Sequence, residues 1–287
     1  MTHLPPERAA IRLPSRTAAR AREVLSGAVA PVTPRDAATV MLLRPAAGGL
    51  QVYMLRRTAS MAFAPGAYVF PGGSVDPRDA EPDIGWAGPG PDVWADVLAV
   101  PEELARALVC AAVRETFEEA GVLLAGPAPG AVLADTSGED WRADRSALLA
   151  GSLSLARMLR RRGLVLRADL LRPWSRWITP LPEKRRYDTR FFAAALPAGH
   201  RALDLGDAAG EADKAVWVDP AMALAAAGRR EIMLLPPTAV TLAELRKCGR
   251  VEAALAGRRS MTPLIPEVSV TGDAVWLTIP AGVEYPL

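Results

Sequence analysis

The chain has 287 residues, half of them hydrophobic, which is enough for one large domain or for one domain with appendages. Its 34 Lys and Arg residues nearly balance its 32 Asp and Glu residues, so it lacks the strong basic excess typical of nucleic-acid-binding domains. Two cysteines and two histidines exclude a disulfide framework, a Cys/His zinc site and catalysis by several histidines, and they fit a reducing interior.

Residues 1–33 are predicted to form a polar, proline-punctuated tail with one short helix. No apolar run approaches the roughly 20 residues of a membrane span, and the N-terminal stretch lacks the apolar centre of a secretory signal. We therefore expect a cytoplasmic protein with a small-molecule substrate, no membrane partner and no nucleic-acid partner. A homodimer is left open.

Residues 34–250 are expected to form the main domain. Two apolar runs around "PAAGG" predict a β-hairpin, and "GAYVF" predicts a short strand that leads into the turn "PGG". Residues 76–101 follow this turn and are dense in Pro, Gly and Asp. We expect this segment to be an inserted surface loop with little regular structure.

A long helix is predicted from Pro101 to a stop at Gly121, because Pro suits the first turn and Gly the helix end. Residues 139–163 predict a further helical segment. Strand patterns then alternate with two helices up to residue 250, and residues 251–287 form an extension that is predicted to contain a β-hairpin. This interleaving predicts an α/β or α+β fold with layered helices and strands.

The long helix has two different faces. Its apolar residues recur at helical spacing and predict a core face that consists of Ala105, Leu108, Val109, Ala112, Val113, Thr116, Phe117 and Ala120. Glu115, Glu118 and Glu119 are neighbours on the other side, where like charges repel by a few tenths of a kcal/mol per pair. They form either a solvated acidic face or a site for a hard cation such as Mg²⁺ or Mn²⁺. Arg114 stands four residues before Glu118, close enough to steady it.

The residues around these acids match a known pattern. "RETFEEAGV", from Arg114 to Val122, resembles the second half of the Nudix box, G-x5-E-x7-R-E-U-x-E-E-x-G-U, in which U is aliphatic. "PGG" at Pro71–Gly73 looks like the start of the box. The resemblance covers roughly residues 35–250 and implies a Nudix-type α/β/α sandwich with a mixed β-sheet.

The pattern departs from the family in its first half. Gly73 stands 41 positions before Arg114 rather than 14, so about 27 residues are inserted, and they coincide with the loop predicted above. Arg106 occupies the place of the first box Glu when it is counted back from Arg114, whereas counting forward from Gly73 gives Asp79 as the best substitute. A split box of this kind resembles the branch that includes the peroxisomal coenzyme A diphosphatases. In the upstream coenzyme A signature, Arg57 is present but Ala62 stands where an Arg is expected.

The resemblance implies a metal-dependent hydrolysis of a diphosphate bond, in which bound Mg²⁺ or Mn²⁺ activates water and neutralises phosphoryl charge. The implied metal ligands are Glu115, Glu118, Glu119 and the backbone carbonyl of Gly72, with Arg114 in a catalytic role. Glu211 is the later catalytic acid that fits best, and Asp213 is its rival. Several basic residues could contact phosphates or form a solvated strand edge, and the candidates are Arg57, Lys184, Arg185, Arg186 and Arg190, with Arg57 and Arg186 assigned to substrate. Trp174 and Trp177 either stack on a base or pack in the core.

The sequence therefore predicts a Nudix diphosphatase, with coenzyme A or acyl-coenzyme A as the favoured substrate. Nucleotide sugars, dinucleotides and nucleoside triphosphates are the alternative substrates. A catalytically inactive Nudix domain that senses a nucleotide is a different hypothesis, but the three box carboxylates favour an enzyme. An interaction module built on the inserted loop and the C-terminal hairpin is a third.

Overall fold

The computed structural model describes residues 9–59, 64–204 and 212–287. In this described part, nine strands form a mixed central sheet. Its two long strands β2 (Arg35–Ala46) and β10 (Tyr187–Ala195) pair in parallel, and β2 pairs antiparallel with β3 (Gly49–Arg57) as the predicted hairpin. The other strands of this sheet are β4 (Ala67–Val69), β5 (Gly72–Ser74), β9 (Arg172–Ile178), β11 (Ala212–Val218), β12 (Met233–Leu234) and β13 (Pro263–Leu264).

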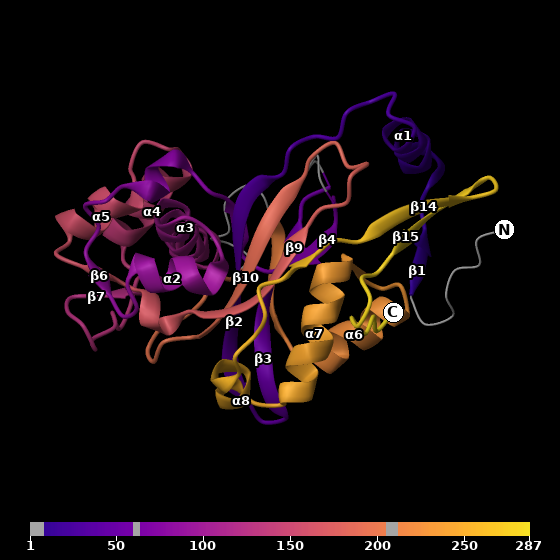
Figure 1. Cartoon of the computed structure of the whole chain (residues 1–287). Coiled ribbons are helices and arrows are strands. Elements are labelled where there is room, and N and C mark those ends of the chain that lie inside the picture. The colour runs from indigo at the N-terminus through magenta and orange to yellow at the C-terminus, as the bar shows by residue number, and fades with distance from the viewer. Residues whose placement is uncertain (1–8, 60–63, 205–211) are drawn as a thin grey trace.

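Helices cover both faces of this sheet (Figure 1), which confirms the predicted α/β/α layering. The helices on one side are α2 (Pro91–Leu98), α3 (Glu102–Ala120), α4 (Glu139–Leu149) and α5 (Leu155–Arg161). Those on the other side are α6 (Pro220–Gly228), α7 (Pro236–Cys248) and α8 (Val251–Ala256). Both faces are therefore buried, and β2 reads as a continuous apolar run for that reason. Val40 and Leu42 pack in the core with α3, while Met41 and Leu43 pack in the core with α7.

The predicted helical segment 139–163 is two helices, α4 and α5, rather than one. Gly151 lies between them with a φ of +68°, a left-handed conformation that favours glycine and ends a helix. Ser154 then begins α5, because its side chain accepts a hydrogen bond from the backbone N–H of Arg157. The composition of the segment predicted its helical content but not this break.

The expectation of an unstructured insert at 76–101 is wrong. The segment forms a 3₁₀ turn η1 (Pro77–Ala80), a short strand β6 (Trp86–Ala87) and helix α2. Strand β6 pairs with β8 (Val165–Arg167), which also pairs with β7 (Ala125–Gly126) and is followed by the turn η2 (Ala168–Leu170). Trp94 and Leu98 of α2 are buried in the same core as α3. Pro91 begins helix α2 at its first turn, so prolines in this insert start structure as well as interrupt it.

The N-terminal segment lies beside the C-terminal hairpin. Strands β14 (Glu267–Thr271) and β15 (Ala274–Thr278) form an antiparallel hairpin, and β1 (Ala10–Arg12) adds a third strand next to β15. Helix α1 (Ser15–Leu25) packs on this small sheet through Ala18 and Ala21, which are buried with Val275. The two ends of the chain thus build one small layer. The domain boundaries at 33/34 and 250/251 remain predictions.

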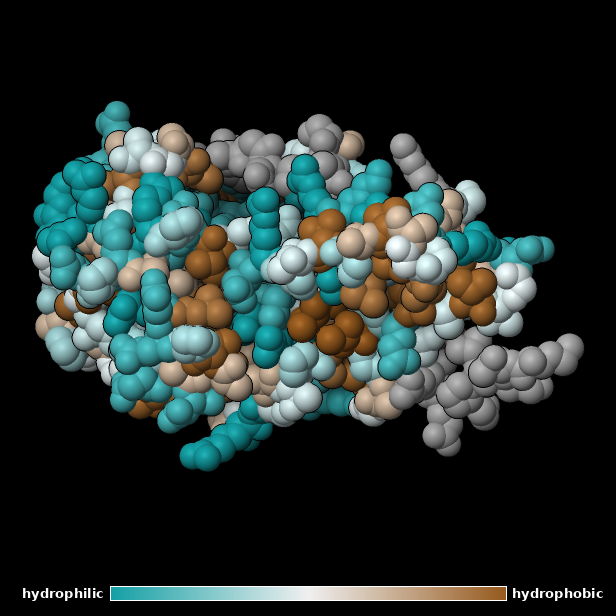
Figure 2. All heavy atoms as spheres, turned by 45° about the horizontal axis from the view of Figure 1, so that its top comes forward, coloured by the Kyte–Doolittle hydropathy of each residue, from teal (hydrophilic) through white to brown (hydrophobic). Residues whose placement is uncertain are grey.

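Figure 2 shows one face of the molecule, on which hydrophilic side chains separate several hydrophobic patches. The most extensive of these patches lies right of centre, on the side where Figure 1 shows α6, α7 and the C-terminal hairpin. Across the described ranges, we find no helix long and apolar enough to cross a membrane.

The burial of α2 predicts that the insert contributes to stability. Trp94 is 4% exposed and meets Phe192 of β10 edge to face, with ring centroids 5.8 Å apart. Trp94→Ala is expected to lower the free energy of unfolding by about 3–5 kcal/mol, because it leaves a cavity in the core. Val97 lies on the same helix and is 40% exposed, so Val97→Ala serves as the control and changes stability by about 0.5 kcal/mol or less. Urea denaturation measures the free energy of unfolding of both variants. A loss for Trp94→Ala as small as that for Val97→Ala would contradict a structural role for the insert.

Candidate functional site

The acidic helix α3 is built as its sequence predicts. Pro101 precedes it, Glu102 and Glu103 lie in its first turn, where the helix dipole favours negative charge, and Gly121 ends it with a φ of +68°. All eight residues of the predicted core face are buried. Packing of this face fixes the rotation of the helix, so Glu115, Glu118 and Glu119 project from the other side toward one pocket.

Arg114 is the central cation of this region. Its guanidinium donates two hydrogen bonds of 2.9 Å to the carboxylate of Asp79, one to the carbonyl oxygen of Ser74 at 3.0 Å and one each to Glu115 at 2.8 Å and Glu118 at 3.2 Å. Burial lowers the pKa of Arg114, but the surrounding carboxylates outweigh this effect and raise it. Arg114 therefore stays charged and holds acids from two segments of the chain together.

Of the two positions considered for the first acid of the box, Asp79 contacts Arg114. Its side chain is 2% exposed, and it accepts the fork of Arg114 on both carboxylate oxygens. The turn η1 orients it, since Asp79 also accepts a hydrogen bond from the backbone N–H of Asp76 in a capping box. Arg106 points elsewhere and pairs with Glu102, whose side chain is 55% exposed.

The three carboxylates line a cavity of about 430 Å³, which we name the carboxylate pocket, together with Gly72 and Gly73 of β5. Gly72 is required by close approach, because a Cβ atom there would lie 2.5 Å from the backbone carbonyl oxygen of Ala38 and 2.7 Å from Cα of Thr39, both on β2. A Cβ atom at Gly73 would meet only the carboxylate end of Glu115. The backbone N–H of Gly72 donates a hydrogen bond of 2.8 Å to Oε2 of Glu119. The insert thus leaves the two halves of the box in contact, with β5 against α3.

The electrostatics of the carboxylate pocket suit a divalent cation. Burial raises the pKa of Glu115 to about 7; Arg114 opposes this rise and Glu118 adds to it. Burial also raises the pKa of Glu118. A hard cation would favour the ionised form of these crowded acids and would find only oxygen ligands among them.

In the described ranges of the chain, no three side chains of His, Cys, Asp or Glu are already arranged to hold a metal ion. The reason is visible in the hydrogen bonds: Glu115 and Glu118 turn toward Arg114, and Glu119 turns toward the amide of Gly72. The donor set nevertheless fits a hard cation, since the three side chains line one pocket and offer only oxygen ligands. Glu115, Glu118 and Glu119 are the residues that would hold it.

Arg185 and Arg186 are neighbours in the sequence, but only one of them lines the carboxylate pocket. Arg186 is buried, and its guanidinium donates to the carbonyl oxygens of Thr179 and Val32, so it does not line the carboxylate pocket. Its neighbour Arg185 lines the pocket, as does Arg57. Arg190 is 1% exposed and pairs with Asp36 and Asp188, which excludes it from contact with phosphates.

The later acid of the site is not defined by the structure. Glu211 lies outside the described residues, as does Ala62 of the upstream signature. Its rival Asp213 forms an exposed ion pair of 2.6 Å with Arg56. Trp174 and Trp177 are both nearly fully buried in the core shared with α7, and Trp174 donates a hydrogen bond to Glu244. The structure therefore supports core packing for Trp174, whereas Trp177 is buried and also lines a second cavity.

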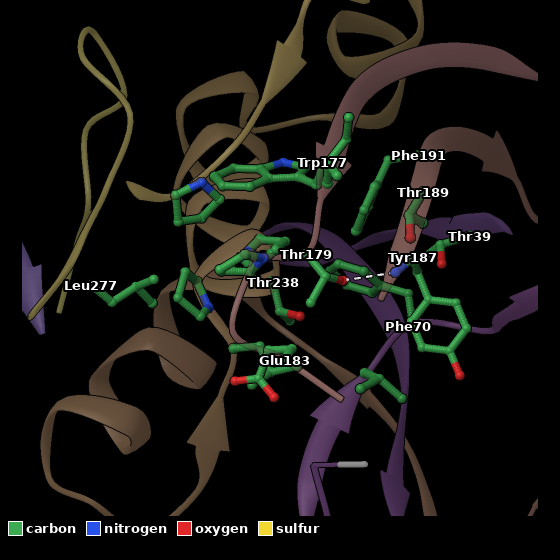
Figure 3. Close-up of a pocket in the computed structure, with 17 residues that line it drawn as sticks. Thr39, Phe70, Trp177, Thr179, Glu183, Tyr187, Thr189, Phe191, Thr238 and Leu277 are labelled. Atoms are coloured by element: carbon green, nitrogen blue, oxygen red, sulfur yellow. Dashed lines mark hydrogen bonds between the residues drawn. The ribbon is translucent and has the colours of Figure 1, made fainter. Parts of the chain in front are cut away.

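A second cavity of about 250 Å³ adjoins the carboxylate pocket and shares five lining residues with it, namely Thr39, Val69, Phe70, Tyr187 and Thr189. We name it the apolar pocket, because its walls are mainly hydrophobic side chains such as Phe70, Trp177, Phe191, Pro236, Pro237 and Leu277. Figure 3 shows Tyr187, Thr189 and Thr39 at one end of this pocket and Leu277 at the opposite end. Sequence analysis missed it because its walls come from distant segments, and no local spacing reveals such a cavity.

Comparisons with known proteins identify the family. Residues 92–245 match the model of the NUDT19 Nudix domain. The chain belongs to the Nudix family. It is 30% identical to the acyl-coenzyme A diphosphatase NUDT19 of Gallus gallus over 74% of this chain and 68% of that protein. The human protein of the same name is 30% identical over 67% of this chain, and the match spans 60% of the human protein's length.

A solved structure supports the same family. The crystal structure of a Nudix hydrolase from Alicyclobacillus acidocaldarius superposes with a TM-score of 0.68 at 29% identity, covering 81% of this chain and 99% of that one. Nudix proteins generally use a divalent metal ion, and the all-oxygen carboxylate pocket of this chain is compatible with one.

The buried pair of Asp79 and Arg114 yields a prediction about stability. Asp79→Ala is expected to lower the free energy of unfolding by about 3–5 kcal/mol, because it removes the main partner of a buried cation. The control is Glu102→Ala, which also removes the carboxylate partner of an arginine on α3, but at a side chain that is 55% exposed. That change should alter stability by about 1 kcal/mol or less. Chemical denaturation measures the free energy of unfolding of both variants. An equal decrease in the two would show that Asp79 does not anchor Arg114.

Proposed function

We propose that this Nudix protein is a Mg²⁺- or Mn²⁺-dependent diphosphatase that hydrolyses coenzyme A or acyl-coenzyme A. The observation that carries the proposal is the carboxylate pocket: three acids of α3 and the glycine turn of β5 meet beside Arg57 and Arg185. Two further observations support the substrate. The relatives named above are acyl-coenzyme A diphosphatases, and an apolar pocket adjoins the polar one.

In this proposal the chain's own residues position the reactants. Arg57 and Arg185 contact the phosphates of the substrate, and Arg185 is suited to this because guanidinium groups bind phosphate oxygens in pairs. Arg114 contacts Glu115 and Glu118 rather than substrate, so it is a positioning residue that keeps two of the carboxylates in place. A bound divalent cation would supply the activation of water and the neutralisation of phosphoryl charge.

The reaction requires one proton acceptor. Water adds to a phosphorus atom, the anhydride P–O bond breaks, and the leaving phosphate takes the bonding electrons. Glu115, Glu118 and Glu119 are the acids among the described residues that line the carboxylate pocket, so the proton of the attacking water passes to one of their carboxylate oxygens. The products from coenzyme A are 3′,5′-ADP and 4′-phosphopantetheine.

A substrate panel with product masses tests the proposal. The panel contains coenzyme A, acyl-coenzyme A, ADP-ribose, a nucleotide sugar, a dinucleotide and a nucleoside triphosphate, each with Mg²⁺ and with Mn²⁺. The expected result is 3′,5′-ADP together with 4′-phosphopantetheine or its acyl derivative. Strong turnover of ADP-ribose or triphosphates with none of coenzyme A would overturn the substrate.

The metal assignment predicts the behaviour of Glu119→Gln. Glutamine keeps the shape of the side chain and an oxygen that can accept the hydrogen bond of Gly72, but it removes one negative charge. At limiting Mg²⁺, kcat is expected to fall roughly 100-fold, while the melting temperature stays the same or rises slightly because repulsion among the acids decreases. Glu103→Gln, an exposed change in the first turn of the same helix, is the matched control and should leave both unchanged. Wild-type turnover by Glu119→Gln would rule out the metal role of Glu119.

The apolar pocket predicts a dependence on acyl-chain length. Leu277→Trp adds bulk at the end of the pocket far from Thr39 and Thr189 (Figure 3), so a long acyl chain should lose space while free coenzyme A should not. We expect KM for a long-chain acyl-coenzyme A to rise at least about fivefold. Val270→Trp places the same bulk on an exposed position of the same hairpin and is the control. If both substrates weaken equally, or neither does, the acyl chain does not occupy this pocket.

A further inference from the structure

A third cavity, of about 260 Å³, lies next to the carboxylate pocket and is lined by four cations, Arg35, Lys184, Arg185 and Arg186. We name it the basic pocket. Arg35 begins β2, and the other three lie in the turn between β9 and β10. The backbone N–H of Arg35 donates a 2.9 Å hydrogen bond to the carbonyl oxygen of Arg186, which fixes the two segments against each other. Among the described residues that line this pocket, none is acidic.

Arg186 is the unusual member of the basic pocket. It is 7% exposed, and its guanidinium donates to two neutral groups, the carbonyl oxygens of Thr179 at 3.0 Å and Val32 at 2.7 Å. Burial alone lowers the pKa of Arg186. Throughout the described part of the chain, no carboxylate forms an ion pair with it.

Two other arginines with little exposed side chain, Arg114 and Arg190, are paired with carboxylates. Arg114 pairs with Asp79, and Arg190 pairs with Asp36. Buried charges in proteins are generally paired, since an unpaired one carries a large desolvation penalty. The positive charge of Arg186, reinforced by Arg35 and Lys184 at the surface, therefore indicates an anion that residues 9–59, 64–204 and 212–287 do not supply.

The position of the basic pocket indicates which anion. Arg185 and Tyr187 line both the basic pocket and the carboxylate pocket, and Tyr187 also lines the apolar pocket. Three compartments of different character thus meet at one tyrosine. A molecule whose diphosphate lies in the carboxylate pocket can extend an apolar arm into one neighbour and a second anionic group into the other.

Coenzyme A and its esters have this composition: an apolar or acylated arm, a central diphosphate and a separate phosphate monoester on the ribose. We propose that the basic pocket binds this ribose phosphate monoester and so selects coenzyme A derivatives over nucleotides that lack it. This inference rests on the proposed function for its substrate. The cations that would attract the phosphate monoester are Arg35, Lys184 and Arg186, which lie outside the carboxylate pocket. Arg185 lines both pockets.

Calorimetric binding of two adenine nucleotides tests the inference without catalysis. Adenosine 3′,5′-bisphosphate carries the ribose phosphate, and adenosine 5′-monophosphate lacks it. The wild-type protein should bind the bisphosphate at least about tenfold more tightly, a preference of about 1.4 kcal/mol, because the additional phosphate meets charged donors in the basic pocket. The variant with Arg35→Ala and Lys184→Ala should lose roughly tenfold of this preference and keep its affinity for the monophosphate. Both side chains are exposed and line the basic pocket alone, so the fold should be retained.

The control is the variant with Arg142→Ala and Arg157→Ala, which removes the same charge from exposed positions of α4 and α5 and should keep the wild-type preference. Absence of a preference in the wild type, or an equal loss of affinity for both nucleotides in the Arg35 and Lys184 variant, overturns the inference.

Turnover of coenzyme A and of dephospho-coenzyme A separates the two proposals. A protein that prefers the bisphosphate but hydrolyses neither compound retains the phosphate site and refutes the proposed function. One that hydrolyses both equally well and shows no binding preference retains the function and refutes the site.

Discussion

The guanidinium of Arg114 joins two parts of the chain that the inserted residues separate. It holds Asp79 from the insert, the carbonyl oxygen of Ser74 beside the glycine turn, and Glu115 and Glu118 from its own helix. Few groups other than a guanidinium could make these contacts at once, because its fork presents five donors in one plane. The arrangement of the carboxylate pocket depends on this one cation, since without it the crowded acids would lose the guanidinium that hydrogen-bonds to Glu115 and Glu118.

The fold accommodates the insert because the chain leaves β5 and returns to α3, which lies against β5. Its first turn supplies Asp79 to the site, and its helix α2 buries Trp94 and Leu98 in the core beside α3. The long interruption of the box therefore extends the fold on one side of the sheet and leaves β5 in contact with α3. The hydrogen bond from the backbone N–H of Gly72 to Glu119 joins the two halves of the box.

Much of this arrangement could be predicted from the sequence where the signal is local. The core face of α3, its ends and the β2–β3 hairpin follow from short-range spacing, and the structure agrees with them. The choice of Asp79 as the first acid of the box stays a prediction, and its hydrogen bonds to Arg114 are compatible with it. The regular structure within residues 76–101 could not be predicted. It depends on the burial of Trp94 of α2 against Phe192 of β10, and these two residues lie far apart in the sequence. Arg185 and Arg186 illustrate the same limit: both are basic neighbours in one turn, and only the fold determines which of them faces the carboxylate pocket.

The central claim is that the acids of α3 form a binding site for a divalent cation. Titration of Mn²⁺ into the chelator-treated protein, followed through the EPR signal of free Mn²⁺, tests it most directly. The account predicts that the wild-type protein removes Mn²⁺ from solution, and that a variant carrying Glu115→Gln, Glu118→Gln and Glu119→Gln leaves the ion free while it remains folded. Equal binding of Mn²⁺ by both proteins would contradict the account.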